Sequence, residues 1–225
     1  MTVSRDDGDT AAARVRAAAA LRELGHVLLA NEVDARLLER IATELAALTR
    51  QAAGAGDRHR DVATLTRRMF ATEVADRDPV VHFDECFVCG PWNPLGIGLE
   101  VTREGDDAVA SVVLGHAFEG GPGMAHGGVV AALFDDLLGY LLTLHRFPAF
   151  TGELTVRYHR PTPIERRLQL RGRVVEHQGR QLVTDGEVQV DGMVVATAQA
   201  TFVRIDTDRL AADRVADGRP GDERR

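Results

Sequence analysis

A short glycine-rich segment runs directly into an apolar stretch that holds two carboxylates. The segment reads G-M-A-H-G-G from Gly123 to Gly128, and the apolar stretch reaches Asp135 and Asp136. Because the apolar run is continuous, it predicts a buried helix that begins near Gly127. The first N–H groups of a helix have no intrahelical partner and carry partial positive charge. Because glycine has no Cβ, a ligand carbonyl can come close to the amides of Gly127 and Gly128, which suits them to stabilise an oxyanion.

The first carboxylate lies two helical turns beyond the glycines. Asp135 stands in an otherwise apolar helix, which is costly unless the carboxylate is used or paired. It follows Gly127 by eight residues, or about 12 Å along one helix axis, whereas a reacting atom must lie roughly 3 Å from both groups. An antiparallel copy of the helix, related by a two-fold axis, would place its Asp135 beside this Gly127. A catalytic site here is therefore expected to be shared across a dimer.

The two cysteines, Cys86 and Cys89, form a single C-x-x-C motif. A zinc site normally needs four ligands; His82 could add a third, but no second cysteine pair supplies a fourth. A redox motif would normally open a helix, whereas residues 90–94 read G-P-W-N-P and favour a turn. The motif therefore indicates two reduced cysteines in a packed loop, and no metal or bound cofactor is expected.

The composition argues against several classes of protein. A net charge of −7 makes general nucleic-acid binding unfavourable. No apolar run approaches about 18 residues and no signal-peptide pattern is present, so we expect a cytoplasmic protein without a membrane span. The chain also lacks the G-x-S-x-G, G-x-x-x-x-G-K-[ST] and G-x-G-x-x-G motifs, so serine-hydrolase, nucleotide-hydrolysis and dinucleotide-binding functions lack support.

The N-terminal part of the chain has helical character. Residues 1–10 are polar and predicted to lack order, whereas residues 11–30 are rich in Ala, Leu and Arg and favour a helix. Asn31 or Asp34 is expected to cap a second helix. The apolar residues of that helix recur at helical spacing, namely at Leu37, Leu38, Ile41, Leu45 and Leu48.

A linker is predicted over 51–57 and a further helix over 61–75, closed by Pro79. Beyond this helix the sequence pattern changes from helix-forming to strand-forming. The central helix is predicted over 127–144. Six segments are predicted as strands: 99–102, 108–114, 150–160, 167–177, 180–191 and 194–205. Gln178-Gly179 and Asp191-Gly192 indicate hairpin turns between the last three. This order favours an α+β layer in which an antiparallel sheet curls around one long helix.

Three pieces of the chain carry a family resemblance. They are C-F-V-C-G from Cys86 leading to N-P-L-G from Asn93, G-P-G-M-A-H-G-G from Gly121 with Asp135 nine residues after its histidine, and T-V-R-Y-H-R-P from Thr155. Together they resemble the hotdog-fold acyl-CoA thioesterases, in particular the phenylacetate-pathway type. The resemblance implies one hotdog domain over 84–205. A helical extension over 1–60, a connecting helix or loop over 61–83 and a charged tail over 206–225 complete the expected organisation.

The resemblance also implies roles for individual residues. It implies hydrolysis of acyl-CoA thioesters by a homodimer or a dimer of dimers, with no metal. The Gly127 amide would polarise the thioester carbonyl, and the partner's Asp135 would activate water or attack directly. His126 would shape the loop or contact the substrate carbonyl, and Gly128 and Thr155 would bind substrate.

Several alternatives stay open. Asp136 could replace Asp135 as the active carboxylate. One branch of the family has an asparagine six residues before the histidine, where this chain has Gly120. A dehydratase or hydratase on the same fold is a rival enzyme. A non-catalytic acyl-CoA-binding or regulatory module is a rival from another class. Four arginines could contact the phosphates of coenzyme A or form a solvated face: Arg157, Arg160, Arg166 and Arg167.

Overall fold

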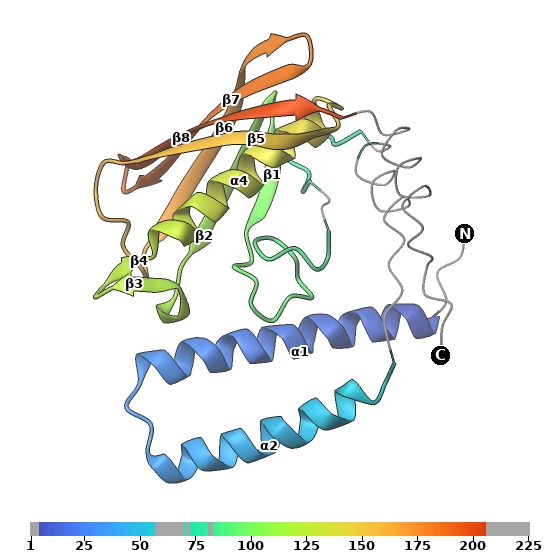
Figure 1. Cartoon of the computed structure of the whole chain (residues 1–225), viewed down its shortest axis with the longest axis vertical. Coiled ribbons are helices and arrows are strands. Elements are labelled where there is room, and N and C mark those ends of the chain that lie inside the picture. Colours follow the sequence, from blue (N-terminus) through green and yellow to red (C-terminus); the bar gives the residue numbers. More distant parts are fainter. Residues whose placement is uncertain (1–4, 57–69, 71–72, 81–82, 206–225) are drawn as a thin grey trace.

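Six antiparallel strands form one sheet in the order β1-β2-β6-β7-β8-β5 (Figure 1). They are β1 (Glu100–Glu104), β2 (Asp107–Val113), β5 (Ala149–Tyr158), β6 (Arg167–Gln178), β7 (Gln181–Val190) and β8 (Met193–Arg204). The computed structural model describes residues 5–56, 70, 73–80 and 83–205. All six predicted strands are present. The turn between β7 and β8 has positive φ at Asp191 (49°) and Gly192 (77°), which matches its predicted hairpin chemistry.

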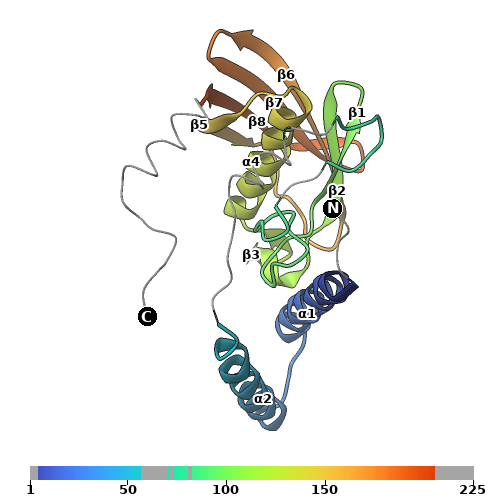
Figure 2. The same ribbon diagram turned by 90° about the vertical axis from the view of Figure 1, so that its right-hand side faces the viewer.

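α4 (Gly127–Leu144) lies along one face of the sheet, and the strands curl around it (Figures 1 and 2). Its fully buried side chains recur at helical spacing and include Leu133, Phe134, Leu137, Leu138 and Leu141. Gly172 on β6 and Gly186 on β7 face this helix, and a Cβ on either would lie 3.0 Å from an α4 side-chain atom. These glycines let the sheet approach the helix closely. The predicted α+β hotdog architecture is confirmed.

By length and composition alone, α4 is apolar enough to cross a membrane. It nevertheless carries Asp135 and Asp136, and 56% of it is buried inside the molecule. These properties are those of a core helix, and its burial against the sheet accounts for its apolar character.

α1 (Arg5–Ala30) is the first helix of a hairpin that precedes the sheet (Figure 1). It begins at Arg5, so the prediction that residues 1–10 lack order is wrong for residues 5–10. Extending an existing helix costs far less than starting one, so the favourable sequence downstream carries the helix back into the polar segment.

α2 (Ala35–Ala53) is capped by Asp34, whose carboxylate accepts a hydrogen bond from the Leu37 N–H at 3.0 Å. This confirms one of the two predicted caps. No residue of α2 is buried in the described structure, so its apolar stripe is half-buried or exposed on the single chain. Most of the helix predicted over 61–75 falls outside the described residues, and the predicted domain boundaries stay predictions.

α1 is fastened to the rest of the molecule at two places. Nδ1 of His26 accepts a hydrogen bond from the Ala117 N–H at 3.0 Å, in the short helix η1 (His116–Phe118). The guanidinium of Arg22 donates to the carbonyl oxygen of Asn93 at 2.6 Å, in the loop before β1. α1 therefore bridges two loops that flank the first two strands.

Candidate active site

A small hairpin of β3 (Glu119–Gly121) and β4 (Met124–Ala125) leads the chain into α4. His126 follows with extended backbone (φ −62°, ψ 132°) and is the N-cap of the helix. Its Nδ1 accepts a hydrogen bond from the Gly128 N–H at 3.0 Å. His126 therefore closes the loop as a helix cap, one of its two expected roles. The Gly128 amide, expected to face substrate, is already engaged by that cap.

Gly127 is the first residue of α4, and its amide is not engaged by the cap, unlike the amide of Gly128. Within the part of the chain that the structure describes, no acceptor takes the Gly127 N–H. Its carbonyl oxygen accepts a hydrogen bond from the Tyr158 hydroxyl at 2.7 Å, which ties β5 to the start of the helix. Tyr158 was not predicted as a site residue, because nothing in the local sequence links it to Gly127 across 31 residues.

A cavity of about 520 Å³ opens beside this helix start. Its lining includes Gly120, His126, Gly127, Tyr158 and Arg160. A Cβ at Gly120 would lie only 2.7 Å from the Cα of His126. The position that holds asparagine in one branch of the family therefore has no room for a side chain here.

Asp135 projects from the exposed side of α4, whereas its neighbour Asp136 is buried, at 9% exposure. Oδ1 of Asp135 accepts a hydrogen bond from the Thr151 hydroxyl on β5 at 3.1 Å. Thr151 is a second residue that the sequence did not predict. The two aspartates thus have different surroundings, and the exposed one is the carboxylate that a substrate can reach.

A β-bulge explains why Thr151 rather than Thr155 meets the helix. The pairing of β5 with β8 shifts register between Thr151 and Glu153, and a Cβ at the intervening Gly152 would lie 3.1 Å from Val203. The bulge puts Thr151 opposite the buried Phe202, on the α4 face of the sheet.

Thr155 lies on the other face of the sheet. It lines a hollow of about 390 Å³ with residues that include Arg157, Arg171 and Arg173. Its hydroxyl donates to Oε1 of Glu153 at 3.4 Å. In this chain Thr155 does not lie beside Gly127 and His126, because strand alternation turns its side chain away from α4, and its role in binding substrate stays a prediction.

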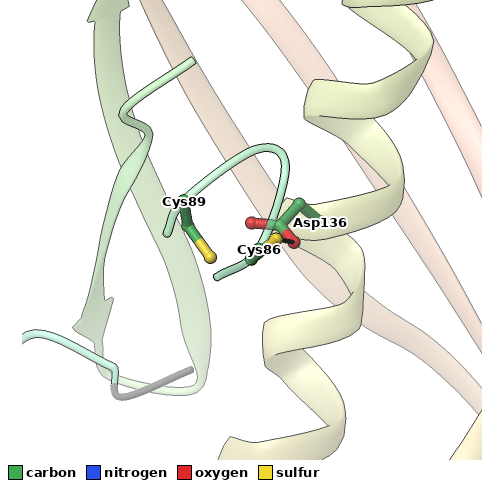
Figure 3. Close-up of side chains that lie close together, drawn as sticks. All are labelled: Cys86, Cys89 and Asp136. Atoms are coloured by element: carbon green, nitrogen blue, oxygen red, sulfur yellow. Dashed lines mark hydrogen bonds between the residues drawn. The ribbon is translucent and has the colours of Figure 1, made fainter. Parts of the chain in front are cut away.

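The two cysteines lie in a loop that packs against the core beside α4 (Figure 3). Both are free of a disulfide, as predicted. The Cys86 thiol donates to Oδ1 of Asp136 at 3.3 Å. A hydrogen bond with Cys86, together with burial, raises the pKa of Cys89, and burial raises the pKa of Tyr140. This cluster involves the buried aspartate, not the exposed one.

Residues 122–204 match the sequence profile of the Thioesterase superfamily. These matched residues form part of a domain of this superfamily, with the hotdog fold described above. In a comparison with solved structures, the "thioesterase superfamily protein" RHA08564 is 28% identical with a TM-score of 0.71, over 84% of this chain and 90% of that chain. The matched 84% of this chain is longer than the whole segment 84–225. The likeness therefore includes part of the region before the thioesterase domain. No curated protein matches the chain.

Two further structures resemble the thioesterase domain less extensively. The PaaI protein of the phenylacetic acid degradation operon of E. coli is 20% identical, over 49% of this chain and 81% of its own, with a TM-score of 0.46. A mutant of the phenylacetic acid degradation protein PaaI from Thermus thermophilus is 28% identical, over 48% of this chain and 95% of its own, with a TM-score of 0.45.

Proposed function

We propose that the protein hydrolyses acyl-CoA thioesters at sites shared by two copies of α4. The observation that supports this most directly is the open Gly127 amide at a cavity, on the same helix as the exposed Asp135. The presence of a thioesterase-superfamily domain supports the reaction class. Acyl-CoA as substrate, the catalytic residues and the dimer belong to the proposal.

The Gly127 N–H would donate to the thioester carbonyl oxygen. As negative charge develops on that oxygen, the fixed amide and the helix dipole stabilise it, an effect typically worth about 10²–10³ in rate. His126 keeps the first turn in place by capping the Gly128 amide. In this scheme Gly127 supplies the donor and His126 positions it.

The partner's Asp135 would supply the second half of the chemistry. As a base, its carboxylate takes a proton from water while the water oxygen attacks the carbonyl carbon. As a nucleophile, it attacks that carbon itself, and water then cleaves the resulting anhydride. In either route the C–S bond breaks, the coenzyme A sulfur leaves and is protonated, and the free acid forms. The Thr151 hydroxyl would orient the carboxylate.

An exposed sheet edge supports pairing of two copies. β5 is the last strand of the sheet and lies next to the exposed side of α4. Phe150 and Tyr158 on this strand are 59% and 52% exposed in the single chain. Apolar edge strands are normally covered. We therefore infer that a second copy covers this edge, in a homodimer or a dimer of dimers.

Of the four arginines considered for coenzyme A, Arg160 has the most suitable position. It lines the cavity at the start of α4. Arg166 is paired with Asp191, and Arg167 donates to the Ser111 hydroxyl at 3.1 Å. Arg157 lies on the opposite face of the sheet. Arg160 is therefore the arginine proposed to contact a coenzyme A phosphate.

Release of free thiol from a panel of acyl-CoAs tests the proposal. Turnover that disappears in Asp135→Asn supports a thioesterase with this site. Tight binding of acyl-CoA without turnover by the unaltered protein would instead support the non-catalytic binding module.

A further inference from the structure

The cysteine loop and α4 bring three potential metal ligands together. Sγ of Cys86, Sγ of Cys89 and a carboxylate oxygen of Asp136 all lie within 4.8 Å of one another (Figure 3). Cys86 and Asp136 are 50 residues apart in the chain, and their ligand atoms are 3.3 Å apart. The cluster plays no part in the proposed hydrolysis, which uses Asp135 on the exposed side of the same helix.

The backbone of the C-x-x-C loop is folded to present both sulfurs to one side. The Val88 N–H donates to Cys86 Sγ at 3.3 Å, and the Gly90 N–H donates to the Cys86 carbonyl at 3.0 Å. A Cβ at Gly90 would lie 2.3 Å from the Cys86 nitrogen, so only glycine fits this tight turn.

The third ligand comes from a buried position on an apolar helix. Asp136 is 9% exposed, and buried carboxylates are generally paired, hydrogen-bonded or bound to metal. A divalent cation held by two thiolates and this carboxylate would tie the loop to α4.

We propose that Cys86, Cys89 and Asp136 bind one Zn²⁺ ion. Zinc prefers thiolate with oxygen or nitrogen donors in a tetrahedron, and Zn–S near 2.3 Å with Zn–O near 2.1 Å places ligand atoms roughly 3.5–3.8 Å apart. The separations in the cluster need only small adjustments to reach this arrangement. Binding displaces the two thiol protons to solvent, and a water molecule or another donor takes the fourth position.

The ion would link the cysteine loop to the buried side of α4. The same loop carries the Asn93 carbonyl that receives Arg22 of α1. Zinc would therefore hold one attachment point of the N-terminal helices against the helix that carries Asp135. The C-x-x-C motif did not predict this site, because the third ligand lies far along the chain.

The test is the metal content of the full-length protein after prolonged dialysis against metal-free buffer. We expect about one zinc per chain by mass spectrometry, and zinc-edge X-ray absorption with two sulfur neighbours. Cys86→Ser, Cys89→Ser and Asp136→Asn should each lower zinc retention at least tenfold. The matched control, Asp135→Asn, should keep the full zinc content.

A second measurement avoids dependence on variants that fail to fold. Unaltered protein stripped with a chelator is given one equivalent of Co²⁺, and we expect sulfur-to-cobalt charge-transfer absorption that Zn²⁺ abolishes. The proposal is overturned if the protein holds no stoichiometric zinc before or after reconstitution, if bound zinc has no sulfur neighbours, or if Cys86 and Cys89 form a disulfide in the native protein.

Discussion

The Thr151 hydroxyl donates to Oδ1 of Asp135 at 3.1 Å, joining the edge strand β5 to the exposed side of α4. The bond restricts the rotation of a carboxylate that would otherwise move freely at the surface. It also sets Asp135 apart from Asp136, which lies on the buried side of the helix and accepts from Cys86. The two adjacent aspartates therefore have different partners and different surroundings.

Replacing Asp135 by asparagine should lower kcat at least a hundredfold with the fold and assembly retained. The amide keeps the shape of the side chain but cannot accept a proton or attack, and general-base catalysis contributes about 10²–10⁴. Thiol release, circular dichroism and light scattering provide the measurements. Full activity in Asp135→Asn, together with loss in a folded Asp136→Asn protein, would mean that the wrong carboxylate has been chosen.

Thr151→Ala should lower kcat about 10–100-fold, whereas Thr155→Ala should leave it unchanged. The first loses a hydrogen bond to a charged group, typically worth about 1.5–3 kcal/mol, and the second alters only the outer face of the sheet. Thr151→Ser should restore most of the activity because it restores the hydroxyl. Equal effects of the two alanine variants would argue against the positioning role of Thr151.

Gly127→Pro should lower kcat about 10²–10³-fold, whereas Gly127→Ala should retain most activity. Proline removes the N–H yet is well tolerated at the first position of a helix, and the extended backbone of His126 is compatible with a following proline. A Cβ at Gly127 would meet the Tyr158 ring at 3.5 Å, an ordinary contact. If a folded Gly127→Pro protein is fully active, the oxyanion donor lies elsewhere.

Mixing the inactive Asp135→Asn and Gly127→Pro proteins should restore activity. In a mixed dimer one of the two shared sites has both an intact amide and an intact carboxylate, so equal mixing should yield about a quarter of wild-type activity. The measurement is thiol release after subunit exchange confirmed by mass spectrometry. Confirmed exchange with no recovery would show that each chain carries its own complete site.

Deletion of residues 1–60 should leave a folded thioesterase domain with a lower Tm. All proposed catalytic residues lie beyond this segment, but the deletion removes the contacts of His26 with Ala117 and of Arg22 with Asn93. Circular dichroism during heating and thiol release measure the two properties. An unfolded product would show that the helices are an integral part of the domain.

The sequence by itself determined the features that depend on neighbouring residues. The apolar run after Gly128 predicted α4 with its correct bounds, Asp34 was among the predicted caps, and Asp191-Gly192 predicted the β7–β8 hairpin. Helix periodicity, capping and turn conformation are local properties, so the residue types in a short window are enough to indicate them.

Only the tertiary structure decided which side chains meet across longer distances. Strand alternation alone gives Thr151 and Thr155 the same face, but the bulge at Gly152 shifts the register and sends Thr151 to Asp135. Likewise, the approach of Cys86 to Asp136 depends on how a loop packs on α4 over a separation of 50 residues. Such contacts arise when the sheet closes around the helix, and no local pattern of residues encodes them.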